Sequence, residues 1–467
     1  MSNELDFQKT LEDSFLLYAG YVAQQRAIPS VEDGLKYSAR QALYTQFYTN
    51  NINSKPFQKG ATPVGQALSL FYDHGDQAIY DMIVRMGKPW ALRYLLEEAD
   101  GSVGTISNAE DHASMRYLSI RLSELGTEMF EGIKKNTIDE WREGHDPKDQ
   151  FPMLLPSKGF YNIVNGASGI GVGLSSSVPQ FNLTEVNSAI IKILQSKTDV
   201  DWSEIYCAPD FATGATIVNA KEVEESLKKG TGKACKIRST IEYDSKTNAL
   251  IVTEIPYSVY TDTIMEQITK IIDENPKSGI VKVVDGSKTS PNIIIYLTKN
   301  ANPTKVMENL FKETNLEYHY SINMTMLEGN RKPRVFGWRE CLQAFIKHSR
   351  HVKFKEIEFD YNKAKDRLEI VEGLLIAIAH IEDVVKIIKN SASAIQAGRI
   401  LKETYSFSDK QVEAILEMKL SRLANLEANK LNKEAETLRE TCEKLLKLMN
   451  SQELMDAEII KDLERVK

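Results

Sequence analysis

Residues 354–378 read FKEIEFDYNKAKDRLEIVEGLLIAI, and apolar side chains recur along this stretch in alternating steps of three and four residues. The same spacing returns between Leu431 and Met449. Heptad seams of this kind are typical of long helices that pack along their length. A shorter helical pattern with a break near Ser406 lies between the two seams. The sequence therefore predicts either an antiparallel helical pair with a small globular cap at its far end, or two long helices of a bundle.

The chain before about Val335 has a different character and divides in two. Residues 150–330 contain β-branched and aliphatic runs between turn residues, with helical stretches at 183–195 and 263–273, which predicts an α+β or α/β domain. Residues 11–145 read as mostly helical, with short helices and turns that suit a helix-turn-helix core. Strands are expected at 163–164, 170–174, 215–218, 250–255, 280–284 and 293–297, and N-terminal helices near 11–19, 38–48 and 77–86.

The composition is that of an ordinary soluble globular protein of several domains. The 467 residues are 42% hydrophobic and 26% charged, and the net charge is −7. No apolar run approaches the ~20 residues that a membrane-spanning helix needs, and the polar N-terminus lacks the layout of a signal peptide. The four cysteines are far apart and form no CxxC, so neither a disulfide framework nor a zinc site is expected. We expect a reducing, intracellular setting and local basic patches rather than a uniformly basic coat.

The glycine-rich segment from Gly166 to Gly173, GASGIGVG, allows two interpretations. As a phosphate-cradling loop it lacks the Lys-Ser/Thr of a P-loop, and neither a helix opening nor an acidic residue follows where a dinucleotide fingerprint needs them. The alternative is a tight crossing at which backbones approach closely. We favour the crossing over a nucleotide site.

Three further features have possible chemical roles. Basic residues on or beside the short N-terminal helices suit phosphate contact, although scattered arginines are usually solvated. Tyr117, in the stretch MRYLSIRL at 115–122, is either a surface phenol or a nucleophile, and a phenol needs nearby cations or a base in order to attack. His74 is either a turn histidine or a phosphate or proton-transfer partner. The basic residues are Arg26, Lys36, Arg40, Arg85, Arg93, Arg116 and Arg121.

Several motifs follow one another along nearly the whole chain. They are RAIPSVEDGLK at 26–36, HGD with AIYDMIVRM at 74–86, MRY at 115–117, NGASGIGVG with NLTEV at 165–186, EIPY at 254–257, INM at 322–324 and the stretch 416–427. Each motif alone is weak, but the ordered set is specific. It resembles the A subunit of DNA gyrase and topoisomerase IV, the breakage–reunion subunit of type IIA DNA topoisomerases.

The resemblance implies roles for particular residues. Tyr117 attacks a DNA phosphodiester and becomes linked to the 5′-phosphate, which conserves the energy of the bond so that resealing needs no ATP. Arg116 stabilises the pentacovalent phosphorus, while Arg26 and His74 contact phosphate and the transition state. Ile170 is an apolar wedge that enters a base step and bends the duplex, and the glycines around it let the backbone come close to the DNA. The remaining expected DNA contacts are Lys36, Arg40 and Arg85.

The resemblance also implies a multidomain α+β architecture and a set of partners. A winged-helix DNA-gate domain is expected at 1–150, an α/β tower domain at 151–332, and a long antiparallel coiled coil with a C-gate dimer interface at 333–467. The assembly would be an ATP-dependent A2B2 type II topoisomerase, since cutting both strands needs two copies of Tyr117 related by a two-fold axis. Mg²⁺ and ATP would be held by the B-type subunit, because this sequence has no P-loop and the family's acidic metal ligands lie on that partner. Double-stranded DNA would be the substrate, in the cytoplasm of a bacterial or phage-infected cell and away from membranes.

Several positions depart from the family pattern. Gln41 replaces a second basic residue after Arg40, Tyr72 replaces a histidine, and ADGSVG at 99–104 stands where the family has QGNFG. These changes bear on strand positioning and gate-drug response and leave the assignment of Tyr117 in place. No β-pinwheel follows Lys467, as in phage subunits or in a truncated form of a longer chain. Relaxation and decatenation are therefore expected rather than supercoiling driven by DNA wrapping.

Two other functions stay open from the sequence. A non-catalytic DNA-bridging coiled-coil scaffold would keep this fold without the chemistry. A nucleotide-dependent enzyme would use the loop at Gly166. Linearisation of plasmid in the presence of a B-type partner and magnesium tests the first, and nucleotide binding by the isolated chain tests the second.

Overall fold

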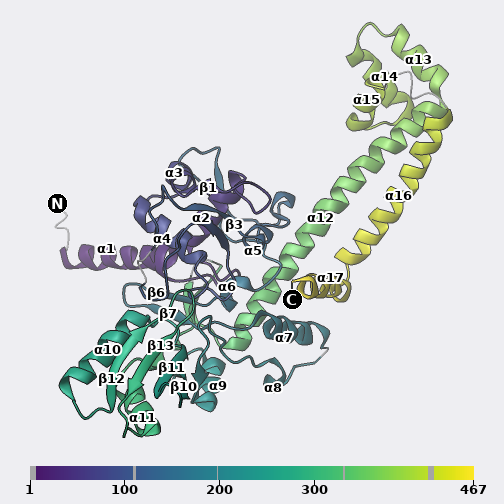
Figure 1. Ribbon diagram of the computed structural model, residues 1–467. Coiled ribbons are helices and arrows are strands. Elements are labelled where there is room, and N and C mark those ends of the chain that lie inside the picture. The colour runs from purple at the N-terminus through teal and green to yellow at the C-terminus, as the bar shows by residue number, and fades with distance from the viewer. Residues whose placement is uncertain (1–6, 109–111, 197, 330–331, 419–424, 467) are drawn as a thin grey trace. The chain divides into compact units, whose positions relative to one another are not determined.

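The computed structural model describes residues 7–108, 112–196, 198–329, 332–418 and 425–466 (Figure 1). The chain forms two compact units. The first unit comprises Met1–Ile133, Ile138–Ser349 and Ile460–Lys467, and the second comprises Lys134–Thr137 and Arg350–Ile459. The first six residues and residues 419–424 of the motif at 416–427 lie outside the described residues. Among the helices that are described, none has a stretch apolar enough to cross a membrane.

The N-terminal part of the first unit packs helices against a small sheet. Three helices contact one another: α2 (Tyr37–Tyr48), α3 (Ala61–Leu70) and α4 (Asp76–Met86). They lie against an antiparallel sheet of order β1-β3-β2. The chain enters this core through helix α1 (Phe7–Val22) and a π-helical turn at Ala23–Ala27. The strands are β1 (Gln58–Lys59), β2 (Glu97–Asp100) and β3 (Ser119–Leu122).

The prediction of a mostly helical segment at 11–145 is correct as far as Met86 and wrong beyond it. After α4 the chain forms β2 and β3, then only short helical turns before another pair of strands. Leu118, Ile120 and Leu122 are all buried. This two-residue period is that of a strand with one buried face, which a helix cannot satisfy. The further elements are α5 (Glu124–Glu128), a 3₁₀ turn (Ile133–Lys135), β4 (Trp141–Glu143) and β5 (Gln150–Pro152).

The rest of the first unit holds most of the strands. Helix α10 packs against the antiparallel sheet β10-β11-β13-β12, whose core includes the buried Leu250, Ile264 and Ile295. A second sheet has the order β14-β9-β8, and β6 pairs with β7 and β15 with β16. The bounds are α6 (Tyr161–Val164), β6 (Ala167–Ile170), β7 (Ser175–Val178), α7 (Leu183–Gln195), α8 (Trp202–Ile205), β8 (Thr216–Ile217), α9 (Ala220–Lys229), β9 (Cys235–Arg238), β10 (Thr240–Asp244), β11 (Ala249–Glu254), α10 (Thr261–Glu274), β12 (Ile280–Asp285), β13 (Ile293–Leu297), α11 (Pro303–Glu313), β14 (Glu317–Tyr320), β15 (Thr325–Glu328) and β16 (Lys332–Val335).

Most of the strands and helices predicted in this region are confirmed, with two corrections. The strand expected at 163–164 is wrong, because these residues belong to the single helical turn α6. The strand expected at 170–174 ends at Ile170, since the next four residues make the hairpin turn. The N–H of Gly171 donates to the carbonyl of Leu174 at 2.7 Å, and Gly173 has a φ of 70°, a conformation that interrupts a strand.

The second unit contains a long antiparallel helical pair closed by a cap of three helices (Figure 1). Arg367 pairs with Glu434 and Arg439 with Glu372, each at 2.7 Å, so α12 and α16 lie side by side. Figure 1 shows the chain running out along α12 to the cap and back along α16, so the two helices are antiparallel. The cap shares an apolar cluster with both helices, which includes Leu374. This matches the antiparallel arrangement with a cap, one of the two alternatives left open. The helices are α12 (Trp338–Ala379, which begins in the first unit), α13 (Ile381–Asn390), α14 (Ala394–Tyr405), α15 (Asp409–Leu416), α16 (Asn425–Met449) and α17 (Gln452–Arg465).

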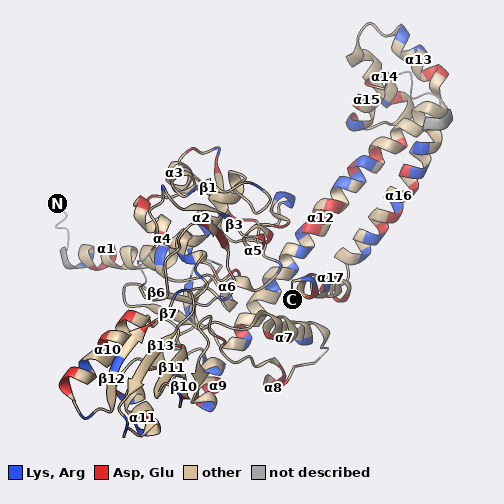
Figure 2. Ribbon diagram, in the orientation of Figure 1, with Lys and Arg blue, Asp and Glu red and all other residues tan. Residues whose placement is uncertain are grey.

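Two local features fit the cap onto the pair. Ser406 ends α14 in the left-handed conformation at φ 58°, at the predicted break. Gly373 of α12 leaves room for the side chain of Gln411, which a Cβ would meet at 2.6 Å. Figure 2 shows acidic and basic residues interspersed along α12 and α16. On α16 the apolar Leu431 and Ala435 are buried, whereas the charged Lys433 and Glu436 are exposed.

Candidate functional site

Tyr117 lies in a loop directly before strand β3, and its side chain is 65% exposed. The backbone of the loop is anchored on both sides of the tyrosine. The N–H of Gly60 donates to the carbonyl of Leu118 at 2.8 Å, and the N–H of Ala61 donates to the carbonyl of Met115 at 3.1 Å. The phenol is therefore accessible to a large substrate while its main chain is held in place.

Helix α4 supports the same loop through Tyr80. The hydroxyl of Tyr80 donates to the carbonyl of Ala113, and its ring stacks on that of His112 at 5.4 Å. Burial raises the pKa of Tyr80 to about 12, so the hydroxyl keeps the proton that it donates. His112 in turn lies 3.0 Å from a carboxylate oxygen of Asp81 on α4. The loop is thus fastened to the helix by contacts that leave Tyr117 free to react.

Two cations lie beside Tyr117. The guanidinium carbon of Arg116 is 5.0 Å from the centre of the phenol ring, and the ammonium of Lys59 reaches the carbonyl of Tyr117 at 3.5 Å. Sequence reasoning missed Lys59. Only the β1–β3 register, which sets Lys59 opposite Ser119, brings it here, and no local pattern in the sequence carries that information.

Arg26 and His74 are both exposed and gather around Tyr72. The rings of His74 and Tyr72 meet edge to face at 5.5 Å. Burial raises the pKa of Tyr72, and the positive charge of Arg26 opposes that shift, which places Arg26 within electrostatic reach. Within the described part of the chain, no recorded hydrogen bond, ion pair or ring contact joins this group to Tyr117.

Lys36 and Arg85 face a small cavity of about 160 Å³ beside the entry of the β6–β7 hairpin. Burial, and then the positive charge of Arg85, lower the pKa of Lys36 to about 8. Arg85 also donates to the hydroxyl of Tyr257 at 3.4 Å. Because Lys36 and Arg85 repel each other electrostatically, an anion bound between them would be stabilised.

Ile170 stands at the tip of the β6–β7 hairpin with its side chain 90% exposed. Gly169 explains how the hairpin is seated, because a Cβ there would lie 1.9 Å from the carbonyl oxygen of Ala27. The predicted close crossing of backbones is confirmed, and no helix opens after the glycines as a dinucleotide loop requires. The close neighbour of Gly169 is thus the π-helical turn that contains Arg26, and the role of the glycines in the approach to DNA stays a prediction.

Arg40 is not at the surface, which corrects its expected role as a DNA contact. Its side chain is fully buried, and its guanidinium donates to both carboxylate oxygens of Asp33 at 2.8 Å and to the hydroxyl of Ser30 at 3.1 Å. Asp33 also accepts from the main-chain N–H groups of Leu35 and Leu155. Arg40 therefore links separate segments inside the protein, and its guanidinium is not accessible to a DNA phosphate.

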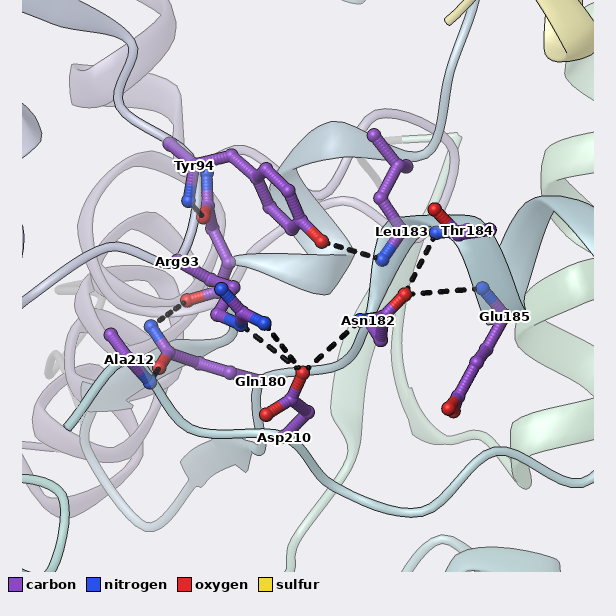
Figure 3. A network of polar contacts seen from close by, with 10 residues as sticks. Arg93, Tyr94, Gln180, Asn182, Leu183, Thr184, Glu185, Asp210 and Ala212 are labelled. Carbon is purple, nitrogen blue, oxygen red and sulfur yellow. Dashed lines mark hydrogen bonds and ion pairs between the residues drawn. The ribbon is translucent and has the colours of Figure 1, made fainter. Parts of the chain in front are cut away.

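Two other arginines from the basic set also have structural partners. Arg93 donates to Asp210 at 2.8 Å (Figure 3). Arg121 pairs with Glu98 at 2.8 Å and lies 4.2 Å above the ring of Phe57. The sequence alone does not separate these two from Arg26 or Arg116, because their acidic partners come from distant segments.

Metal-binding groupings are missing from the part of the chain that the structure describes: no three or more His, Cys, Asp or Glu residues lie together so that they could hold an ion. The buried thiols are also poor ligands in their resting form. Burial raises the pKa of Cys207 and of Cys235 to about 12.

Comparison with known proteins gives a consistent result. A family model for the A subunit of DNA gyrase/topoisomerase IV matches residues 26–464. The chain is 34% identical to the DNA gyrase A subunit of Metamycoplasma arthritidis over 467 residues, which cover 99% of this chain and 52% of the relative. It is 35% identical to the DNA gyrase A subunit of Thermotoga maritima over 439 residues, 92% of this chain and 54% of the relative. It is 32% identical to the DNA topoisomerase 4 A subunit of Staphylococcus epidermidis over 471 residues, 99% of this chain and 58% of the relative. The chain thus spans about half the length of the curated relatives it matches.

Proposed function

Because the chain belongs to the family of DNA gyrase and topoisomerase IV A subunits, we propose that it cleaves and rejoins double-stranded DNA as one component of a type II DNA topoisomerase. The observation that carries this proposal is Tyr117. It occupies the family's active-site triplet, and its phenol is 65% exposed on a backbone fixed by main-chain hydrogen bonds. A nucleophile that must reach a DNA phosphate needs both properties.

The proposed reaction is a reversible transesterification. The phenol oxygen of Tyr117 attacks a backbone phosphorus and releases its proton, an O–P bond forms, and the bond from phosphorus to the 3′ oxygen breaks. The leaving 3′ oxygen takes up a proton, and the 5′-phosphate stays on the tyrosine. Attack by the 3′-hydroxyl on this ester reverses each change, so resealing needs no external energy.

The cations of the site suit the charge that develops. The guanidinium of Arg116 lies against the phenol ring, and the ammonium of Lys59 reaches the main-chain carbonyl of Tyr117. We assign both to the negative charge that grows on the non-bridging phosphate oxygens in the transition state. We assign phosphate and transition-state contacts to the exposed Arg26 and His74. Lys36 and Arg85, which face one small cavity, are assigned to the DNA backbone.

Ile170 is proposed as the wedge that enters a base step. Its 90% exposure at a hairpin tip is costly for an isoleucine in water and suits insertion into an apolar stack. Unstacking a base step costs a few kcal/mol, which wider contact with the bent duplex offsets.

The cofactors and partners complete the proposal. Mg²⁺ and ATP are assigned to a B-type subunit, because the resemblance to the family implies that the acidic metal ligands and the ATPase lie on that partner. The pairing of two chains follows from the chemistry, because a double-strand break needs two phenols related by a two-fold axis. We propose an A2B2 assembly that acts on double-stranded DNA in the cytoplasm of a bacterial or phage-infected cell.

The domain assignment remains part of the proposal. Residues 1–150 are proposed as a winged-helix DNA-gate domain, an assignment supported by the three helices α2–α4 and the three-stranded sheet beside them. Residues 151–332 are proposed as the tower, and 333–467 as the coiled coil with a dimer interface at its cap. The side chain of Ile395 on α14 is 87% exposed, which suits a contact with a second copy there.

The test is a cleavage assay with the Tyr117→Phe variant. The full chain is mixed with a B-type subunit, Mg²⁺ and plasmid, and denaturant traps covalent protein–DNA adducts. We expect linear plasmid and adducts with the unmodified chain and none with Tyr117→Phe, while DNA binding and the unfolding midpoint stay unchanged, because an exposed hydroxyl contributes little to the fold. Adducts that persist in the variant would assign the nucleophile elsewhere, and their absence from the unmodified chain would favour a non-catalytic scaffold.

A further inference from the structure

The hairpin that carries Ile170 is held at its base by two buried amide side chains. Asn165 precedes strand β6 and Gln180 follows strand β7, so they stand where the chain enters and leaves the hairpin. Their side chains belong to residues that are 5% and 0% exposed. Both residues are buried, and Asn165 also lines the cavity that Lys36 and Arg85 face.

The side-chain amide of Asn165 forms two hydrogen bonds with the main chain of Tyr94. Its Oδ1 accepts from the N–H of Tyr94 at 2.7 Å, and its Nδ2 donates to the carbonyl of Tyr94 at 2.7 Å. A two-point contact sets orientation as well as distance, because an amide that rotates loses both bonds. Tyr94 lies in the segment that follows α4, so the start of the hairpin is tied to the part of the chain that carries the candidate site.

Gln180 ties the end of the hairpin to the same segment. Its Nε2 donates to the carbonyl of Ala91 at 3.0 Å and to the carbonyl of Asn165 at 2.9 Å, and its Oε1 accepts from the N–H of Ala212 at 2.8 Å. Figure 3 shows this amide beside Ala212, in a network that continues through Arg93, Asp210 and Asn182. The side chain of Gln180 thus links the two ends of the hairpin to each other and to the segment after α4.

A hairpin of two short strands needs such support. An isolated two-stranded hairpin is marginally stable in water. The side chain of Ile170 adds little packing to stabilise the hairpin, since it is almost wholly exposed. The outer part of the hairpin is held by hydrogen bonds of Ser175 and Ser177 with Asn323 and by the close contact of Gly169 with Ala27. Asn165 and Gln180 hold its base, so part of the force on Ile170 passes down both strands to them.

We propose that Asn165 and Gln180 are positioning residues for DNA bending, which hold the β6–β7 hairpin so that Ile170 meets the base stack at a fixed height and angle. This inference rests on the proposed function and goes beyond it, because it assigns the geometry of the wedge to two buried residues at the base of the hairpin. Loss of either side-chain amide is expected to weaken DNA bending, because Ile170 is still present but the base of its hairpin is less firmly held.

The experiment compares single and double variants in the full chain, reconstituted with Mg²⁺ and a B-type subunit. Energy transfer between dyes at the ends of a linear duplex reports bending, and trapped adducts report cleavage. Asn165→Ala is expected to lose part of the bending that Ile170→Ala loses, because the contacts of the hairpin with Asn323 and Ala27 remain, and to reduce cleavage with it. Gln180→Met, which keeps the side-chain volume, is expected to do the same. Adding Asn165→Ala to Ile170→Ala is expected to lower bending and cleavage no further, since both changes act through one contact.

Asn182→Ala is the matched control. Asn182 belongs to the same network and caps α7 by accepting from the N–H groups of Thr184 and Glu185, but it makes no bond to the hairpin. It is expected to lower thermal stability without changing bending. Equal loss of bending in Asn182→Ala and Asn165→Ala overturns the proposal, as does a further drop in the double variant. If Asn165→Ala does not fold, Gln180→Met decides alone.

The outcomes also separate this inference from the function on which it rests. If the unmodified chain forms no adducts, the proposed function fails and the inference fails with it. If the unmodified chain forms adducts and bends DNA, and Asn165→Ala and Gln180→Met bend it equally well, the inference alone is wrong.

Discussion

The segment that carries the candidate site and the helical pair of the second unit use charged side chains in opposite ways. In the first, Arg40 and Asp33 are completely buried together and hold separate loops in register. In the second, Arg439 and Glu372 pair at the surface with side chains 57% and 40% exposed, while an apolar seam fills the interior.

The difference indicates whether the charged side chains of each region contribute to the free energy of unfolding. A buried ion pair has lost its hydration, so removal of one partner leaves an uncompensated charge in the interior. A surface pair is screened by water and salt, and each partner is well solvated without the other. The same residue types are therefore structural in one region and nearly neutral in the other, and four substitutions test this contrast.

The largest effect is expected for Arg40→Ala. The change strands the carboxylate of Asp33, so the free energy of unfolding should fall by about 3–5 kcal/mol. Urea unfolding measures the loss, and Arg116→Ala is the control, since Arg116 is an exposed arginine of the same segment. If both variants lose the same stability, burial is not what distinguishes the two arginines.

A similar or smaller loss is expected for Leu374→Ala in the second unit. Leu374 is 1% exposed in the cluster that joins the cap to the helical pair. Its truncation should cost about 2–5 kcal/mol, through lost apolar burial and the cavity left behind. Leu446→Ala on α16 is the control, because Leu446 is 44% exposed, and its unfolding midpoint should move far less. Equal shifts would contradict an apolar seam as the main source of stability there.

A moderate effect of pH is expected from Lys36. Burial and the charge of Arg85 lower the pKa of Lys36 to about 8, so its ammonium is charged below that pH and neutral above it. If Lys36 contacts a DNA phosphate, affinity should fall a few-fold as the pH rises through 8. Fluorescence anisotropy with a labelled duplex measures this fall. It should be weaker in Lys36→Met, and parallel pH profiles would remove Lys36 from the DNA contacts.

The smallest effect is expected for Arg439→Ala. Its partner Glu372 stays hydrated when the arginine is removed, so the free energy of unfolding should change by at most about 1 kcal/mol. The change should shrink further at high salt, as measured by urea unfolding at two ionic strengths. A loss comparable to that of Arg40→Ala would mean that the two regions do not differ in the way described.

Local patterns in the sequence were enough for much of the fold. The heptad seams predicted α12 and α16, and β-branched and aliphatic runs between turn residues predicted β11, β12 and β13. Strand β3 was not predicted, although apolar and polar residues alternate from Leu118 to Leu122, because this stretch is short and follows segments with a helical pattern. The ordered motifs identified the family, and the roles of Tyr117, Arg116, Arg26, His74 and Ile170 stay predictions.

The sequence by itself determined which side chains are able to act as nucleophile, cation or wedge, because those capacities belong to the residue types. Only the tertiary structure decided which of them do so in a given place. It buried Arg40 with Asp33, set Lys59 beside Tyr117 through one strand register, and fixed the base of the Ile170 hairpin with Asn165 and Gln180. The physical reason is that solvation, charge environment and rigidity arise from contacts between residues tens of positions apart, and no local pattern encodes those contacts.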